Sequence, residues 1–381
     1  MKIGITTFGC DGGKSGISQY LIRLLHGFPG LAAGDEFELL TLAEDAPVFL
    51  PEGSPIVPVV PSGVTASPVR SILWHLLNLP RVARQRGYDV LFLPAGNRRL
   101  PRRMPCPTVG TIHDFSWLHM AGKYDMFRTF YLTRILPRLM GRLTLALTVS
   151  ESSRGDILAN TSLPPERVLV THLAADPDTY QPRDREAARA RLAARYGITK
   201  PYVLYISRLE HPGKNHVALI QAFQILKAAG LEHQLVLPGG DFLGAEMVHQ
   251  AAAASPCHDD IILTGFADFA DLPYLYNGAD LFVFPSLYEG FGLPLLEAMA
   301  SGTAVAAANR SSLPEVGGQA AVYFDPHQAE DMAEAIGGLL RDPDRRRSYE
   351  QAGLARAAEF SWRRTAEQTL AAIRQAARTK V

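Results

Sequence analysis

The segment at residues 284–302, FPSLYEGFGLPLLEAMASG, constrains the fold of this chain more than any other. It begins at the end of an apolar run, residues 281–284, that is typical of a buried strand, and it continues through a glycine-containing loop into a short apolar helix. Pro294 suits the first position of that helix, and Gly302 suits its C-terminal cap. A strand, a tight loop and a helix in this order predict an α/β domain.

Two glutamates predict a ligand site in the same segment. Glu289 lies in the loop, and Glu297 follows after seven intervening residues inside the apolar helix, where an unpartnered carboxylate is costly to bury. Glycine allows the backbone to approach a ligand closely, and the N–H groups at a helix N-terminus favour an anion. We therefore expect a phosphorylated sugar whose hydroxyls meet the two carboxylates. Its phosphate would lie near the backbone of Gly290, Phe291, Gly292 and Leu293. The alternative is a plain turn followed by a surface glutamate.

The composition fits an ordinary globular protein that is long enough for two domains. The chain has 381 residues, of which 47% are hydrophobic and 20% are charged. The 38 Lys and Arg residues equal the 38 Asp and Glu residues, so no net charge indicates a nucleic-acid partner. The three cysteines form no CxxC pair, which argues for a reducing compartment and against a disulfide framework or a zinc site. No apolar run approaches the ~18 residues of a membrane span, so we expect a cytoplasmic protein.

A second strand–loop–helix pattern begins the chain. Residues 2–7 have the pattern of a short buried strand, residues 9–16 (GCDGGKSG) form a glycine-rich loop, and a helical pattern runs from about residue 17 to 25 with Ser15 placed to cap it. An NTPase P-loop is disfavoured, because that motif needs a glycine at position 8, where this chain has Phe. A loop against a donor phosphate and a purely structural turn are the other interpretations.

Strand-like segments recur at residues 37–41, 90–93, 108–112 and 145–149, with helical patterns between them. This alternation predicts a mostly parallel, doubly wound sheet. His113 directly follows the third of these segments, at the sheet edge where ligands of open α/β sheets gather. The chemistry alone leaves a ligand contact and a structural histidine open.

The C-terminal half repeats the pattern with cations in the loop. A hydrophobic strand at residues 202–206 leads into residues 207–216, SRLEHPGKNH, and then into a helix. Arg208 and Lys214 lie six residues apart across a proline–glycine turn, so both side chains can reach one point and neutralise a diphosphate. Surface ion pairs are the alternative.

A local charge bias lies within residues 70–142. This region holds 13 Lys and Arg residues against three acids, with Trp74, Trp117, Phe127, Phe130 and Tyr131 interleaved. A basic and aromatic surface of this kind suits anionic lipid headgroups or a lipid diphosphate. We therefore expect peripheral contact with the inner face of the cytoplasmic membrane. The alternative is a solvated basic face over core aromatics.

The paired glutamates in EGFGLPLLEAMASG resemble the motif of the large family of retaining glycosyltransferases known as family 4 or group 1. The likeness extends over nearly the whole chain and implies a GT-B fold, in which two Rossmann-like, doubly wound α/β domains face a cleft. It also implies transfer of a hexose from a nucleoside-diphosphate sugar, of the GDP-mannose or UDP-glucose type, to a glycan or lipid-linked acceptor in bacterial cell-surface polysaccharide synthesis. It implies no metal or other cofactor.

The resemblance assigns roles to individual side chains. Arg208 and Lys214 would hold the donor pyrophosphate and assist its departure. Glu289 would orient the sugar, and Glu297 would hold the ribose. His113 would contact the transferred sugar or the acceptor.

The resemblance also implies a set of backbone contacts to the donor. The nucleotide base would lie near Gly265 and Phe266, which follow an apolar strand at residues 261–263. The glycine-rich loop of the first domain would lie against the diphosphate through Gly12, Gly13 and Gly16.

We place the domain boundary near residues 178–200, a stretch in which residues 184–195 have the pattern of a charged helix that Gly197 ends. The predicted N-terminal, acceptor-side domain covers residues 1–178, a linker covers 179–200, and the donor domain covers 201–358. The resemblance implies that the last helix, within residues 359–381, crosses back to the N-terminal domain.

Other functions fit less of the pattern. Asp-x-Asp at residues 176–178 and 342–344 suits a metal-dependent transferase, but the first pair lies near the domain boundary and the second begins a charged helix. A Rossmann oxidoreductase would need a GxGxxG motif after residues 2–7, where none is present. A sugar-nucleotide epimerase of the same fold would act without an acceptor, and a non-catalytic nucleotide-binding protein would show no turnover.

Overall fold

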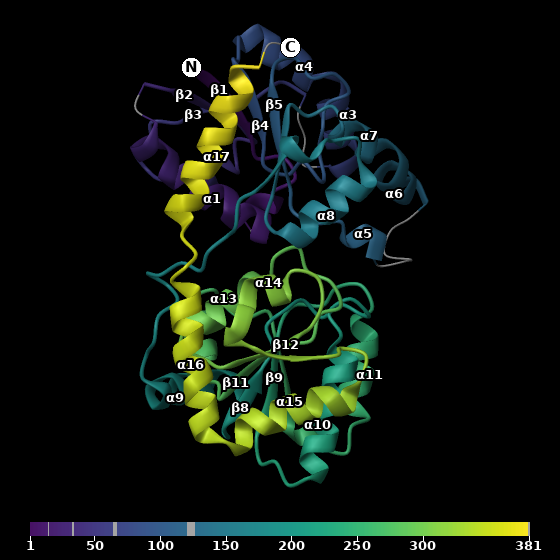
Figure 1. The fold of residues 1–381 in the computed structure, drawn as a ribbon, viewed down its shortest axis with the longest axis vertical. Helices are drawn as coiled ribbons and strands as arrows, with labels where there is room; N and C mark the ends of the chain where they lie inside the picture. Colours follow the sequence, from purple (N-terminus) through teal and green to yellow (C-terminus); the bar gives the residue numbers. More distant parts are fainter. Residues whose placement is uncertain (14, 33, 64–66, 120–125, 380–381) are drawn as a thin grey trace. The chain divides into compact units, whose positions relative to one another are not determined.

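The protein forms two compact units in a computed structural model that describes residues 1–13, 15–32, 34–63, 67–119 and 126–379 (Figure 1). The first unit comprises Met1–Leu173 together with Ser361–Val381, and the second comprises Ala174–Phe360. Each unit contains one parallel sheet with helices around it, so the predicted α/β class is confirmed.

Seven parallel strands form the first sheet, in the order β3-β2-β1-β4-β5-β6-β7. They are β1 (Lys2–Thr6), β2 (Glu36–Leu40), β3 (Val57–Val59), β4 (Val90–Leu93), β5 (Thr108–Ile112), β6 (Leu145–Thr148) and β7 (Val168–Val170). The five strands predicted from apolar runs are confirmed. The sequence did not predict β3 and β7, because each has only three residues and lies at an edge of the sheet.

The helices of the first unit begin with α1, which Ser15 caps as predicted: its Oγ accepts a hydrogen bond from the N–H of Ser18 (3.4 Å). At the other end of the chain α17 packs against α1, and Thr365 Oγ1 donates to the carbonyl oxygen of His172 (2.6 Å). The helices are α1 (Gly16–Leu31), α2 (Ala46–Phe49), α3 (Pro68–Leu77), α4 (Leu79–Arg86), α5 (Ser116–His119), α6 (Met126–Phe130), α7 (Leu136–Met140), α8 (Glu151–Asn160) and α17 (Trp362–Ala377), with the π-helical turn Tyr131–Ile135 between α6 and α7.

Strand β4 shows why the first sheet is apolar on both faces. Leu91 and Leu93 belong to a core cluster that also holds Trp74 of α3. Phe92 points to the opposite face, where its ring lies 6.5 Å from that of Phe28 in α1. Burial on both faces explains why β4 is a continuous apolar run.

Six parallel strands form the second sheet, in the order β10-β9-β8-β11-β12-β13. They are β8 (Tyr202–Leu204), β9 (Gln234–Pro238), β10 (Ile261–Gly265), β11 (Leu281–Phe284), β12 (Val305–Ala308) and β13 (Val322–Phe324). The helices are α9 (Arg185–Tyr196), α10 (His216–Ala228), α11 (Ala245–Ala253), α12 (Leu272–Gly278), α13 (Leu293–Ala300), α14 (Leu313–Gly317), α15 (Ala329–Arg341) and α16 (Pro343–Ala357).

Both sheets are doubly wound and reverse their strand order once. The reversal lies between β1 and β4 in the first sheet and between β8 and β11 in the second. Open α/β sheets bind ligands beyond the carboxyl ends of the strands at such a point. In the second unit the loops at this point are residues 205–215, with the predicted cations, and residues 285–292, with the first predicted glutamate.

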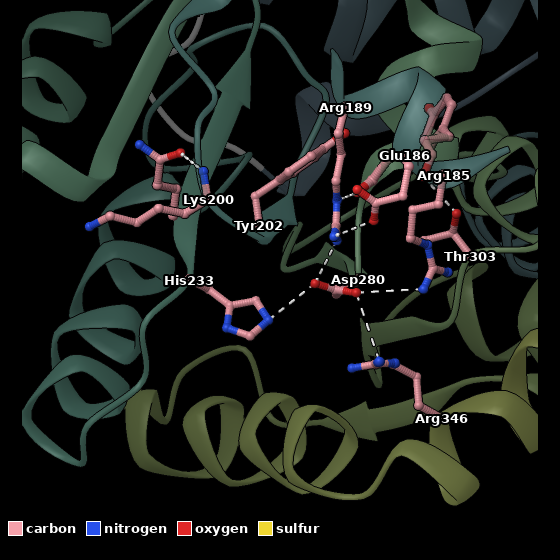
Figure 2. A network of polar contacts seen from close by, with 12 residues as sticks. Arg185, Glu186, Arg189, Lys200, Tyr202, His233, Asp280, Thr303 and Arg346 are labelled. Carbon is pink, nitrogen blue, oxygen red and sulfur yellow. Dashed lines mark hydrogen bonds and ion pairs between the residues drawn. The ribbon is translucent and has the colours of Figure 1, made fainter. Parts of the chain in front are cut away.

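The segment predicted as a linker, residues 179–200, belongs to the second unit. The chain passes between the units at residues 173 and 174, and returns at residues 360 and 361, instead of at the predicted positions 178 and 358. α9 packs against α12, and its arginines reach buried carboxylates of this unit: Arg189 lies 2.8 Å from Asp280, and Arg191 lies 2.9 Å from Asp271. The helix looks solvated in the sequence because these acids lie 91 and 80 residues further along the chain. Figure 2 shows that Asp280 is also approached by Arg185, Arg346 and His233.

Among the described residues, no helix combines the length and the apolar character that crossing a bilayer requires.

Candidate functional site

The loops after β8 and β11 meet at the switch point of the second sheet. The backbone N–H of Leu287 donates to the carbonyl oxygen of Gly213 (3.0 Å). The Tyr205 hydroxyl donates to the carbonyl oxygen of Lys214 (3.0 Å) and shares a hydrogen bond with Ser286 Oγ (2.9 Å). These bonds hold one loop against the other, so residues that are far apart in sequence share one site.

Lys214 and Glu289 form an ion pair between these two loops. Lys214 Nζ lies 2.6 Å from Glu289 Oε1, and both side chains are partly buried. The main chain of Glu289 is fixed as well, because its N–H donates to Ser311 Oγ and its carbonyl oxygen accepts from Ser312 Oγ, each at 2.9 Å. An ammonium group has three donors, so Lys214 can keep Glu289 and still donate to an anion.

Arg208 is held by two side chains that the sequence did not single out. Its guanidinium lies over the ring of Phe242, 4.2 Å from the centroid, and Nη2 lies 3.2 Å from Oε2 of the buried Glu210. The loop after β9 brings Phe242 here, because the Phe242 N–H donates to the Leu209 carbonyl and the Leu209 N–H donates to the Gly240 carbonyl, both at 3.0 Å. The Arg208 side chain is nevertheless 55% exposed, so it can contact a ligand.

The N-terminus of α13 follows Gly290 in the same loop. The N–H groups of Gly292 and Leu293 donate no hydrogen bond to any part of the chain that the structure describes. Gly292 has a φ of 95°, and a Cβ there would lie 2.7 Å from Leu313 Cδ2, so this position requires glycine. The Phe291 side chain is buried. Two backbone donors of the predicted anion site are therefore available at Gly292 and Leu293.

Glu297 lies on α13, about one helical turn after Leu293. Its Oε2 accepts a hydrogen bond from the Tyr276 hydroxyl (2.8 Å), and its carboxylate is also hydrogen-bonded to Tyr180. Burial raises the pKa of Glu297 to about 7, because it outweighs the two tyrosine hydrogen bonds that lower it, and the charge of Asp176 raises it further. Part of the hydrogen bonding that the sequence assigned to a ligand hydroxyl is thus supplied by tyrosines from elsewhere in the unit.

Gly265 and Phe266 lie at the carboxyl end of β10. Gly265 has a φ of 67°, and its carbonyl oxygen accepts from the N–H of Gly239 (2.9 Å), which joins this loop to the loop after β9. Phe266 is 69% exposed, and its ring packs edge-on against that of Phe269, also exposed, at 5.9 Å. Two exposed rings beside a glycine form a surface on which a planar group can stack.

The glycine-rich loop of the first unit follows β1. Gly12 and Gly13 have φ values of 55° and 91°, and a Cβ on Gly13 would lie 2.5 Å from Val48 Cγ1. Gly16 is the first residue of α1, with open space beside it. The sequence did not single out Arg98, which ties this loop to the end of β4 by an ion pair with Asp11 (2.6 Å) and a hydrogen bond to the carbonyl oxygen of Gly9 (2.9 Å). The turn itself thus requires glycine at positions 12 and 13.

His113 follows β5, at the predicted sheet edge. Its Nε2 lies 2.8 Å from the carbonyl oxygen of Pro94, which can only accept, so Nε2 carries the proton. Burial lowers the pKa of His113 to about 4, against the raising effect of that hydrogen bond. The ring is therefore neutral at pH 7, and its Nδ1 has the character of an acceptor.

The two Asp-x-Asp pairs have structural contacts. Asp176 Oδ2 accepts from Thr179 Oγ1 (2.5 Å), and Asp342 Oδ1 caps α16 by accepting from the N–H of Arg345 (2.9 Å). Within the part of the chain that the structure describes, no three His, Cys, Asp or Glu side chains are grouped as a metal site requires.

The basic region of the first unit divides into buried and exposed parts. Trp74 and Tyr131 are buried, as in the alternative of a basic face over core aromatics. Met126 and Phe130 are 78% and 59% exposed. Exposed arginines follow along the same stretch at positions 134, 138 and 142. Lys123 lies outside the described residues, as does the side chain of Phe127.

Comparisons with known proteins agree with this architecture. Residues 189–356 match the family model "Glycosyl transferases group 1", and residues 14–179 match "Glycosyltransferase Family 4". The chain is 34% identical over 290 residues to the O-antigen chain mannosyltransferase B of Escherichia coli, an alignment that covers 76% of this chain and 75% of the relative.

Solved structures show the same fold at lower identity. Sucrose-phosphate synthase from Thermosynechococcus elongatus superposes with a TM-score of 0.78 at 18% identity, over 98% of both chains. Anabaena HepE, solved in complex with UDP-glucose, superposes with a TM-score of 0.74 at 20% identity, over 97% of this chain and 98% of its own.

Proposed function

The chain belongs to the group 1 glycosyltransferases, with the two-domain GT-B fold, and on that premise we propose that it transfers a hexose from a nucleoside-diphosphate sugar to a glycan or lipid-linked acceptor with retention of configuration and without a metal. The observation that carries the proposal is the group of side chains at the switch point of the second sheet. There the Lys214–Glu289 pair joins two loops: one also carries Arg208, and the other leads to the backbone donors of Gly292 and Leu293.

The proposed roles follow from the chemistry of these groups. The negative charge on the leaving diphosphate grows as the bond to the sugar breaks, and Arg208, Lys214 and the N-terminus of α13 are the positive groups that would stabilise it. Glu289, fixed through its side chain and both backbone groups, would accept hydrogen bonds from sugar hydroxyls. Glu297 would accept from the ribose.

We assign retention to a front-face reaction. The acceptor hydroxyl would attack the anomeric carbon on the face from which the diphosphate leaves, and its proton would pass to the departing phosphate oxygen. Neutral His113, whose Nδ1 can accept a hydrogen bond, would contact the transferred sugar or the acceptor. The proposed reaction uses neither a carboxylate nucleophile nor a metal ion.

The donor is proposed as GDP-mannose or UDP-glucose. Similarity to the mannosyltransferase of Escherichia coli favours mannose, and the UDP-glucose complex of Anabaena HepE keeps the second donor open. The exposed rings of Phe266 and Phe269 offer a surface for either base. Cell-surface polysaccharide synthesis is the proposed process, because the relative is an O-antigen enzyme.

A lipid-linked acceptor would bring the first unit to a membrane surface. Met126 and Phe130 can enter the headgroup region, and the exposed Arg134, Arg138 and Arg142 follow them with no acid in between. Basic residues near an anionic surface contribute ~1 kcal/mol each, and salt screens this attraction. We therefore propose peripheral binding to the inner face of the cytoplasmic membrane.

Turnover with defined sugar nucleotides tests the enzymatic proposal. Purified protein should consume GDP-mannose or UDP-glucose only when an acceptor is present, keep its rate in excess chelator, and form a product with the donor's anomeric configuration. Conversion of the donor without an acceptor would favour an epimerase. Binding without turnover would favour a non-catalytic protein, and a requirement for added divalent metal would contradict the metal-free mechanism.

Vesicle sedimentation tests the membrane proposal. The protein should bind anionic vesicles at low salt and dissociate at high salt, and a triple reversal of Arg134, Arg138 and Arg142 to Glu should weaken binding. A matched control reverses three exposed residues elsewhere, Arg345, Arg347 and Arg363. Equal affinity for neutral and anionic vesicles, or equal loss in both triple variants, would contradict the proposed surface.

A further inference from the structure

Glu297 interacts with three side chains, which come from two other segments of the second unit. Tyr276, on α12, is fully buried and donates its hydroxyl hydrogen to Glu297 Oε2 (2.8 Å). Tyr180, from the segment that precedes α9, is also hydrogen-bonded to the carboxylate, and the two tyrosine rings are 5.6 Å apart at an interplanar angle of 79°. The carboxylate is thus held from two directions.

Asp176 shapes the segment that carries Tyr180. Its carbonyl oxygen accepts from the N–H of Tyr180 (2.8 Å), and its carboxylate accepts from Thr179 Oγ1 (2.5 Å), so residues 176–180 form a closed turn. The Asp176 side chain is buried, and its negative charge acts on Glu297. This turn begins two residues after Ala174, where the chain enters the second unit.

We propose that Tyr276, Tyr180 and Asp176 are positioning residues for Glu297: the tyrosines hold the carboxylate so that its remaining lone pairs face a hydroxyl of the donor ribose, and Asp176 fixes the turn that carries Tyr180. The inference rests on the proposed role of Glu297 as the ribose contact. It adds residues from the start of the second unit to the donor site.

A purely structural role does not explain this arrangement. Burial and the charge of Asp176 both oppose ionisation of Glu297. A neutral side chain at position 297 would remove that cost and keep the packing of α13. Carboxylates with a perturbed pKa of this kind cluster at functional sites. We therefore expect Glu297→Gln to fold at least as stably as the wild type while binding the donor less well.

The surroundings of Glu297 give the proposal a measurable pH signature. Burial raises the pKa of Glu297, the hydrogen bonds from Tyr276 and Tyr180 lower it, and the charge of Asp176 raises it further. Removing a tyrosine hydroxyl should therefore raise that pKa, and removing the Asp176 charge should lower it. The ionised carboxylate is the better acceptor, so the ribose contact strengthens as pH rises through the pKa of about 7.

Other helices packed on α13 bring charged groups that act elsewhere. Arg356 of α16 donates to the carbonyl oxygens of Glu315 and Val316 in α14, and it pairs with Glu359. The pKa of Glu297 is shifted by burial, by the hydrogen bonds of the two tyrosines and by the charge of Asp176.

Calorimetric titration with two pairs of ligands isolates the ribose contact. UDP and GDP are each compared with their 2′,3′-dideoxy analogues between pH 5.5 and 8.5, and the ratio of the two affinities is followed. Protonation of the phosphates affects both members of a pair equally, so the ratio reports the hydroxyls alone. We expect the ratio to rise with pH to about 10- to 100-fold, the range for a hydrogen bond to a charged group.

The variants should move the midpoint of that rise in opposite directions. Tyr276→Phe and Tyr180→Phe should move it to higher pH, and Asp176→Asn should move it to lower pH. Tyr274→Phe is the matched control, because Tyr274 lies on the same helix but packs under Arg191, 4.3 Å from the ring centroid. It should leave the midpoint unchanged.

The outcomes separate this inference from the ribose assignment. If Glu297→Gln keeps the wild-type ratio at every pH, Glu297 does not bind the ribose and both proposals fail. If Glu297→Gln abolishes the ratio but the tyrosine and aspartate variants leave the midpoint in place, the ribose assignment stands and the positioning role is wrong. Should Tyr276→Phe fail to fold, Tyr180→Phe and Asp176→Asn still give shifts of opposite sign to compare.

Discussion

Asp280→Asn is expected to destabilise the second unit strongly and to leave the first unit intact. Asp280 precedes β11, and its buried carboxylate is surrounded by Arg189 (2.8 Å), His233 (3.3 Å), Arg185 (3.5 Å) and Arg346 (3.8 Å), as Figure 2 shows. These partners come from α9, α16 and the chain before β9, so one carboxylate joins three parts of the unit. The substitution keeps the shape of the side chain and removes its charge.

The magnitude follows from the burial of the group. Removing one partner of a buried ion pair costs about 3–5 kcal/mol, because the remaining charge is left uncompensated. The partners of Asp280 keep 17–31% of their side-chain exposure, which reduces the effect. We therefore expect the lower end of the range, about 3 kcal/mol. For a unit of this size that corresponds to a fall in Tm of roughly 6–12 °C.

The pH dependence has a definite sign. Burial would raise the pKa of Asp280, but the hydrogen bond with His233 and the charges of Arg189 and Arg346 outweigh it, so the folded pKa lies below the ordinary value. The stabilisation is then fully present above the ordinary Asp pKa and is lost as pH falls through the folded pKa. The difference between wild type and Asp280→Asn should thus be constant near neutral pH and shrink only in acid.

The distribution of tryptophan allows the two units to be followed separately. All three tryptophans, at positions 74, 117 and 362, lie in the first unit. In urea, circular dichroism should show an earlier transition for Asp280→Asn, while tryptophan fluorescence should keep its midpoint. Asp344→Asn is the control, since Asp344 and its partner Arg347 are both exposed and such pairs contribute little. If Asp280→Asn is no less stable than this control, the assigned role of the network is wrong.

Four further substitutions test the proposed donor site. Arg208→Ala and Lys214→Ala should each lower turnover by a factor on the order of 10²–10³ with little change in stability, and near-normal turnover would refute their role at the diphosphate. Glu289→Gln should weaken binding of the sugar nucleotide, because Glu289 is the proposed acceptor for the sugar hydroxyls. It should not weaken binding of the bare nucleoside diphosphate, because loss of the ion pair frees Lys214 for the phosphates. Equal losses in calorimetry would argue against a sugar contact. Gly292→Ala should lower the free energy of unfolding by about 1–3 kcal/mol more than Gly230→Ala does. Both glycines have a φ near 90°, but only a Cβ at position 292 would clash with a buried side chain, that of Leu313. Equal costs in chemical denaturation would show that Leu313 moves to make room.

Much of the fold was readable because its signals are local. A continuous apolar run such as residues 90–93 predicts a strand that is buried on both faces, and the glycine-containing loops indicate where β1 and β11 end. Strands β3 and β7 escaped prediction because edge strands of three residues leave too short a pattern. The strand order at the two switch points follows from pairing between distant segments, which no single run of sequence records.

The candidate site divides in the same way. The sequence singled out Glu289, Lys214 and Arg208, because each sits in a short motif whose residue types and spacing suit a sugar diphosphate. It did not disclose Glu210 or Phe242 beside Arg208, or the tyrosines beside Glu297. Glu210 lies in the same loop as Arg208 and carries no distinctive pattern. Phe242 and the tyrosines come from other segments, and only the folded chain brings them to Arg208 and Glu297.

The predicted linker shows what only the tertiary structure decided. By itself the sequence determined that a charged helix lies between two α/β domains, because propensity and capping are local properties: Asp184 accepts from the N–H of Ala187 and Gly197 ends α9. It could not determine which domain this helix packs against. α9 belongs to the second unit, where its arginines form ion pairs with the buried carboxylates of Asp271 and Asp280. A buried carboxylate without such a partner would be costly, and only the folded chain brings these distant residues together.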